Sequence, residues 1–69
     1  MASKRDRVLL IKMKDDTNPI SPGTKGTVFS VIPADVAAPR TYVVDWDNGK
    51  RQQLIEGWDE FEVIGNLLQ

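Results

Sequence analysis

The segment from residue 42 to residue 50 constrains the fold most, because it predicts a strand that runs into a tight hairpin turn. Tyr42, Val44 and Trp46 occupy alternate positions, and a period of two places their side chains on one face of a strand. Asp47-Asn48-Gly49 follows directly, and these residue types tolerate the backbone angles that hairpin turns require. We therefore expect the rest of the chain to fold as short strands around this hairpin.

The register of the hairpin decides which face of the return strand carries Leu54. A two-residue turn would send Leu54 to the face opposite Trp46. A three-residue loop that ends in a left-handed Gly49 instead pairs Trp46 with Lys50. It also brings Leu54 opposite Tyr42, on the core face. We predict this second, bulged form, because it buries the large apolar side chain of the return strand.

The absence of cysteine and histidine excludes most ways of stabilising or activating so short a chain. The sequence has 69 residues, enough for one domain that buries only about 60% of its unfolded surface. Without cysteine or histidine it can form neither a disulfide nor a zinc site of the usual type. Nucleophiles activated by histidine are excluded as well. We expect a non-enzymatic domain without cofactor or metal.

Charge and hydropathy exclude further classes of function. Nine basic residues against ten acidic ones give a formal net charge of −1, so no overall field attracts nucleic acid or an anionic membrane. The longest apolar run, residues 8–11, is too short to span a bilayer or to serve as a signal peptide. The lack of cysteine is compatible with a reducing compartment, and we expect a cytoplasmic protein.

The pattern of apolar residues and turn residues predicts an all-β domain: a small, five-stranded SH3-like barrel. The strands are expected at residues 7–13, 26–32, 40–47, 50–55 and 61–64. Residues 57–60 predict a tight turn that could form one turn of 3₁₀ helix. Gly26 is expected to allow a bend or a close backbone approach. The barrel would span residues 6–64, between a flexible lead (1–5) and a tail (65–69).

Two proline-containing loops interrupt the strands. In the loop 15–25, Pro22-Gly23 fits the centre of a type II turn. Its acidic residues do not make a calcium loop, because the sixth position from Asp15 is Ile20 and the twelfth is Gly26, where Gly and Glu are required. Pro19 and Pro22 have the spacing of a polyproline ligand, or serve only to stiffen the loop. The second loop, 33–39, is bounded by prolines and is too short to support a helix.

Four blocks in the chain occur in an order that resembles a known family. The blocks are Asp6-Arg7-Val8, Pro22-Gly23-Thr24-Lys25-Gly26-Thr27-Val28, Trp46-Asp47-Asn48-Gly49 and Asp59-Glu60-Phe61-Glu62-Val63-Ile64. They resemble a family of short bacterial and phage proteins designated only as a domain of unknown function (four-three-one-four). The resemblance covers residues 6–64, implies an SH3-like barrel and implies no catalytic residues. The chain departs from it in the loop 33–39, where the family has a tight acidic turn, and at Trp58, where the family has a smaller residue.

Three hypotheses about function follow, the first being a protein-interaction module encoded by a phage or mobile element. Its contact surface would use Pro19, Ile20, Pro22, Val36 and Trp58. The second is a nucleic-acid-binding barrel, for which the basic candidates are Lys4, Arg5, Arg7, Lys12, Lys14, Lys50 and Arg51. Interspersed acidic residues favour a mixed-charge surface instead, with Lys50 facing Asp47. The third is a structural subunit of a homo-oligomer.

The aromatic residues have competing structural and functional interpretations. We expect Trp46 and Phe61 to fill the core and Tyr42 to keep its hydroxyl in water. Trp58 either caps one end of the barrel or stands partly exposed as an interface anchor, with the cap slightly favoured. The sequence alone does not identify the partner.

Overall fold

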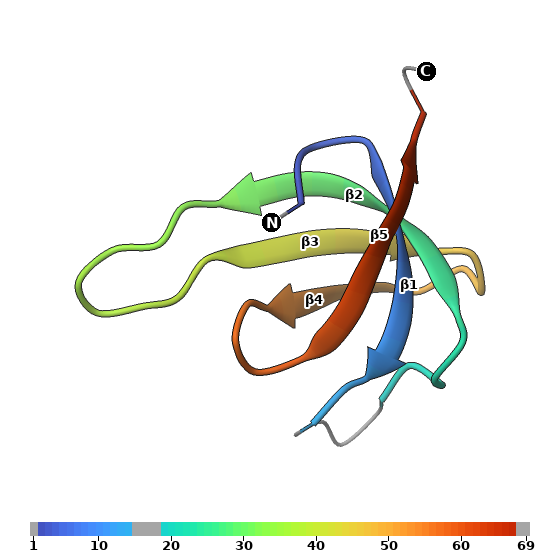
Figure 1. Cartoon of the computed structure of the whole chain (residues 1–69), viewed down its shortest axis with the longest axis horizontal. Coiled ribbons are helices and arrows are strands. Elements are labelled where there is room, and N and C mark those ends of the chain that lie inside the picture. Colours follow the sequence, from blue (N-terminus) through green and yellow to red (C-terminus); the bar gives the residue numbers. More distant parts are fainter. Residues whose placement is uncertain (1, 15–18, 68–69) are drawn as a thin grey trace.

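The structure of the protein is a computed structural model that describes residues 2–14 and 19–67. Its five strands are β1 (Asp6–Lys12), β2 (Lys25–Ile32), β3 (Thr41–Trp46), β4 (Arg51–Ile55) and β5 (Glu60–Asn66). They form one antiparallel sheet in the order β4-β3-β2-β1-β5 (Figure 1), which confirms the predicted all-β, five-stranded fold. Within the described ranges, no helix is long and apolar enough to cross a membrane.

The sheet curls on itself and gives the domain a barrel-like shape. In Figure 1, β2 curves along its length, so that β1 and β5 run across the direction of β3 and β4. The register of β2 against β3 shifts between Val28 and Ser30, and that of β1 against β5 shifts twice. Such bulges bend a strand and increase its twist. Strands β4 and β5 are left at the two edges of the sheet.

One apolar cluster fills the inside of the curled sheet. Its buried members are Ala2, Val8, Leu10, Ile20, Val28, Tyr42, Val44, Trp46 and Leu54. Trp46 is 3% exposed, which confirms its prediction as a core residue. Phe61 is only partly buried and packs against the cluster, with its ring edge-to-face on Tyr42 at a centroid distance of 5.5 Å.

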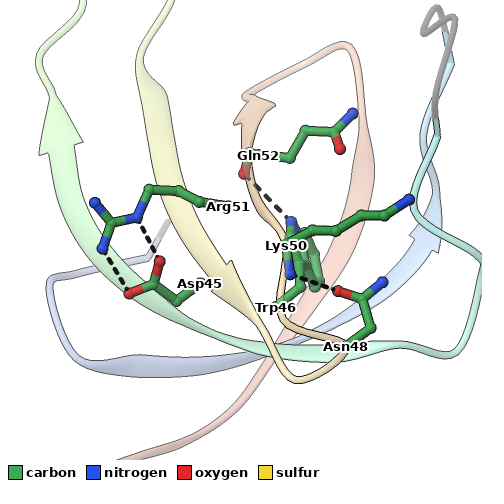
Figure 2. Close-up of polar contacts among 6 residues, drawn as sticks. All are labelled: Asp45, Trp46, Asn48, Lys50, Arg51 and Gln52. Carbon is green, nitrogen blue, oxygen red and sulfur yellow. Dashed lines mark hydrogen bonds and ion pairs between the residues drawn. The ribbon is translucent and has the colours of Figure 1, made fainter.

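The hairpin has the predicted bulged register. The Trp46 amide donates to the Lys50 carbonyl at 2.8 Å, and Gly49 has the expected positive φ of 90°. Leu54 lies opposite Tyr42 and is fully buried. The indole nitrogen of Trp46 donates to the carbonyl of Gln52 at 3.3 Å (Figure 2), so burying the ring leaves no unpaired donor.

Gly26 provides the close backbone approach that its position predicted. It lies opposite Trp46 in the β2–β3 register. A Cβ atom at this position would lie 2.6 Å from Val44 Cγ1 and 2.9 Å from Trp46 Cε3. The Trp46 ring and the Val44 side chain therefore occupy the space that a side chain at position 26 would need. The Pro22-Gly23 turn is confirmed too, because Gly23 has a φ of 90° and Thr24 N donates to Ser21 O at 3.2 Å.

Both described ends of the chain contact the sheet. Before β1, Ala2 is buried and Arg5 N donates to Val28 O at 2.8 Å. At the other end, β5 continues through Gly65 to Asn66 by pairing with β1, two residues beyond the strand predicted at 61–64. This long-range pairing supplies hydrogen bonds that the weak strand propensity of Gly-Asn does not indicate.

The expectation that the Tyr42 hydroxyl stays in water is wrong. Tyr42 is fully buried, and its hydroxyl accepts from Ala2 N at 3.3 Å while donating to Glu56 Oε1 at 3.1 Å. Glu56 also forms an ion pair with Arg40 at 3.5 Å. The N-terminal segment covers the phenol, and these two partners replace the lost water. Burial raises the pKa of Tyr42 above its ordinary value, and Glu56 raises it further.

We predict that Gly26→Ala destabilises the domain by about 1–3 kcal/mol, the usual cost of overpacking a core. The new methyl group would have to displace Val44, Trp46 and the backbone oxygen of Asp45, which lies 3.0 Å away. Gly65→Ala is the matched control, since a Cβ there meets nothing within 4 Å. Urea unfolding should show a lower midpoint for the first variant only. Equal midpoints would mean that Trp46 does not pack against Gly26.

We also predict that unfolding at alkaline pH is linked to Tyr42. An unfolded tyrosine loses its proton near pH 10, so the raised folded pKa leaves stability intact below that pH. Stability then falls as pH rises through the folded-state value. Tyr42 is the single tyrosine, so tyrosinate absorbance reports it directly and should appear together with loss of the circular dichroism signal. Tyr42→Phe should flatten the alkaline slope. Titration near pH 10 in a folded protein would contradict the buried phenol.

Candidate functional site

The turn between β4 and β5 presents the aromatic side chain that the core does not use. Ile55 O accepts hydrogen bonds from Trp58 N at 3.1 Å and from Asp59 N at 2.9 Å, and Gly57 has a positive φ of 82°. This is one hydrogen-bonded turn in place of the suggested 3₁₀ helix. It leaves Trp58 48% exposed, so the ring stands half-exposed on the surface and is not buried as a cap would be.

Asp59 holds this turn against two strands. One carboxylate oxygen accepts from Lys14 N at 3.1 Å, and the other accepts from Ile55 N at 2.9 Å. The carboxylate therefore ties Lys14, two residues beyond the end of β1, to Ile55, the last residue of β4. Because its neighbour is fixed at both sides, Trp58 is held at a defined place on the surface.

Trp58 lines two hollows. The first, of about 370 Å³, is lined by Met13, Arg51, Gln52, Gln53, Ile55, Trp58 and Asp59. The second, of about 410 Å³, is lined by Pro39, Ile55, Glu56, Gly57 and Trp58. In the first, Gln52 Nε2 lies 3.6 Å from the sulfur of Met13. Together they give a shallow surface lined by both apolar and polar side chains, which we call the Trp58 surface.

Lys14 adds a positive charge to the Trp58 surface. Its ammonium lies 5.4 Å from the centroid of the indole ring, within the range of a cation–π contact. Among the described residues, no carboxylate forms an ion pair with this ammonium.

The predicted protein-binding residues do not form one surface. Ile20 is 1% exposed and belongs to the core, so its assignment as a contact residue is wrong; the chain turns it inward just before the Ser21–Thr24 turn. Pro19 and Pro22 are exposed near one end of the molecule. Figure 1 shows the β2–β3 loop, which carries Val36, projecting at the other end. Trp58 stands apart from both, in the β4–β5 turn.

Asp35 organises the loop that presents Val36. Its Oδ1 accepts from Ala37 N at 2.7 Å and from Ala38 N at 2.8 Å, while Asp35 N donates to Ala38 O at 2.9 Å. These bonds form a compact turn at the tip. Val36 is fully exposed there and contributes nothing to the core.

Two of the predicted nucleic-acid-binding arginines are neutralised by aspartates. Arg7 donates to both oxygens of Asp47 at 2.8 and 2.7 Å, and this pairing replaces the expected Lys50–Asp47 pair. Arg51 likewise pairs with Asp45 (Figure 2). The hydrogen bonds from the arginines lower the pKa of Asp47 and Asp45.

The remaining basic candidates are divided between separate places. Lys4 and Arg5 precede β1 and line a hollow of about 300 Å³ with Phe29 and Leu67. Lys12 and Lys14 lie at the other end of β1, and Lys50 lies at the hairpin turn. Arg5 has a φ of 74°, which is uncommon for a residue with a side chain. Its carbonyl accepts from Leu67 N at 3.0 Å, so both neighbouring segments hold this conformation.

Sequence reasoning missed Asp59 and Met13. The signal for Asp59 was an acidic residue inside a predicted turn, where side-chain oxygens commonly accept backbone amides. Nothing in the sequence indicated that Met13 would meet Gln52. In residues 2–14 and 19–67, acidic side chains nowhere gather in the groups of three that could hold a metal ion. Residues 15–18 of the rejected calcium site lie outside the described residues.

Comparison with known proteins identifies the family of the chain but no function. A family model described as "Domain of unknown function (DUF4314)" matches residues 4–64. No curated protein and no solved structure gives a significant match. The match covers nearly all of the curled sheet, including the hairpin, the Trp58 turn and most of β5. The chain therefore belongs to the DUF4314 family of domains of unknown function.

Proposed function

We propose that this chain is a non-enzymatic module that binds another protein through the Trp58 surface. The observation that carries the proposal is a tryptophan that is 48% exposed although the carboxylate next to it is fixed by two backbone amides. A tryptophan that only fills space would be buried, as Trp46 is. A fixed, half-exposed one loses little entropy when a partner covers it.

The composition of the surface supports a protein partner. Tryptophan is enriched among the residues that dominate binding energy at protein interfaces. Met13 adds an adaptable apolar contact, and the side-chain amide of Gln53 offers hydrogen bonds. The chain has neither histidine nor cysteine to provide a general base or a nucleophile of the common kinds. A chain without cysteine also suits the reducing cytoplasm, where we place this interaction.

The test compares two exposed aromatic residues. We predict that Trp58→Ala stays folded. Its affinity for the partner should fall about 30-fold or more, the effect of removing an interface anchor worth about 2 kcal/mol. Phe29→Ala is the matched control, since Phe29 is also 48% exposed but lies on β2. Proteins captured by the immobilised full chain should be lost with the first variant and kept with the second. Capture that survives Trp58→Ala would contradict the proposal.

Val36 offers a second check on where the contact lies. Val36→Asp should leave the domain folded because the side chain is fully exposed. If the contact is confined to the Trp58 surface, capture by this variant should match the wild type. Loss of capture with Val36→Asp but not with Trp58→Ala would move the interface to the β2–β3 loop.

One observation favours nucleic-acid binding as a second candidate function. Lys4, Arg5 and the exposed ring of Phe29 line the same hollow, and cations beside an aromatic ring suit single-stranded nucleic acid. The guanidinium of Arg51 lies 4.1 Å from the Phe29 ring centroid, which reduces the ring area open to a base. If this candidate function is right, a heparin column retains the chain in a salt-dependent way. The double variant Lys4→Ala/Arg5→Ala should abolish this retention. The control Lys12→Ala/Lys50→Ala removes equal charge elsewhere.

A further inference from the structure

Strand β4 is an edge of the sheet whose outward backbone groups can be identified. Trp46 N donates to Lys50 O at 2.8 Å, and Glu56 N donates to Arg40 O at 3.0 Å. Hydrogen-bonded pairs alternate along an antiparallel ladder, so these two bonds fix the phase of the whole β3–β4 pair. Gln52 and Leu54 direct their backbone groups toward β3. Those of residues 51, 53 and 55 point away from the sheet.

The turn that carries Trp58 satisfies only the last of these outward positions. Ile55 N donates to Asp59, and Ile55 O accepts from the amides of Trp58 and Asp59. The backbone groups of Arg51 and Gln53 bond to no other described residue. Asp59 and the turn thus cover the outward groups of Ile55. The outward groups of Gln53 and Arg51, which bond to no other described residue, lie beside the first hollow of the Trp58 surface.

The other edge of the sheet is protected in a way that β4 is not. The pairing of β5 with β1 contains two register shifts, and β5 begins with Glu60 and Glu62. Bulges and charges are the usual means of keeping an edge strand from pairing with another chain. The β3–β4 pairing has no register shift, and the middle of β4 is uncharged. Of the two edges, β4 is the one suited to accept a strand.

The geometry points to an extended segment of a partner protein that adds to β4 as a further β-strand. This inference rests on the proposed function and specifies its ligand. Backbone groups of the segment bond to Gln53 and Arg51, the mode known as β-augmentation. One apolar side chain of the segment enters the hollow between Met13 and Trp58, and a carboxylate lies beside Lys14.

Charge complementarity selects an acidic segment over a basic one. The ammonium of Lys14 has no ion-pair partner among the described residues. Asp59, the carboxylate that lines the first hollow, already accepts two backbone amides. Arg51 lines the same hollow, but its guanidinium is already paired with Asp45. The acidic group on the segment is therefore placed beside Lys14.

The test removes one backbone donor from β4. Gln53→Pro deletes the outward N–H without touching the β3 ladder, a position where an edge strand tolerates proline. Gln53→Thr is the control, because it changes the side chain and keeps the N–H. The probe is a short synthetic peptide of alternating threonine and valine with a central leucine and one glutamate. Binding is followed by NMR titration of the full chain.

We expect the peptide to shift the amides of Arg51 and Gln53 and the indole of Trp58. Gln53→Pro should weaken binding at least about tenfold, equal to 1.4 kcal/mol, whereas Gln53→Thr should bind nearly as wild type. Replacing the glutamate by lysine should weaken binding, and N-methylation of the peptide backbone should abolish it. Circular dichroism must show both variants folded; a Gln53→Pro variant that unfolds would contradict an outward-facing N–H.

Three results would overturn strand addition. The first is that the peptide leaves the amides of β4 unperturbed. The second is that it binds Gln53→Pro as well as the wild type. The third is that the β4 shifts depend on protein concentration alone, which would identify a second copy of the chain as the occupant. The capture assay separates this failure from that of the proposed function. If Trp58→Ala loses the captured protein while Gln53→Pro keeps it, the Trp58 surface binds a partner without a shared ladder. If Trp58→Ala keeps it, the proposed function fails.

Discussion

The contact between the Trp46 ring and the backbone of Gly26 is the constraint on which the remaining structure depends. Gly26 pairs with Val8 on one side and with Trp46 on the other, so this layer of the core joins β1, β2 and β3. A side chain at Gly26 would occupy the position of the ring. The largest core side chain can therefore pack this close to the backbone of β2 only because Gly26 has no side chain, and the sheet can curl tightly around it.

The position of Trp46 also determines the functional surface. The three-residue turn pairs Trp46 with Lys50 and so fixes which residues of β4 face β3. A slip of one residue would turn Leu54 out of the core and reverse the direction of every backbone group on the edge. The open groups of Gln53 and the burial of Leu54 are thus two consequences of one register. The edge beside Trp58 is set by the same core that stabilises the domain.

The features that could be predicted are those encoded by neighbours in sequence. Local patterns were sufficient to predict the five strands, the hairpin register and the role of Gly26. These patterns are the alternation around Tyr42, the Asp-Asn-Gly turn and a glycine inside a strand. Ile20 was misjudged because a residue between two prolines gave no periodic signal. The Tyr42 hydroxyl was misjudged because its partner Ala2 lies 40 positions away. Arg7 and Asp47 are also 40 positions apart in the sequence, so the nearby charge of Lys50 suggested the wrong partner for Asp47. Trp58 was identified as a candidate, but its support by Asp59 depends on where β1 ends.

Amide hydrogen exchange along β4 of the free protein tests the central claim most directly. The claim is that the hairpin register leaves alternate backbone groups of this edge open next to Trp58. We expect slow exchange at Gln52 and Leu54, fast exchange at Arg51 and Gln53, and protection at Ile55 by the Asp59 carboxylate. Uniform protection of β4 would show that its edge is covered in the free protein. Fast exchange at Gln52 and Leu54 would show that the register is different, and either result would contradict the account.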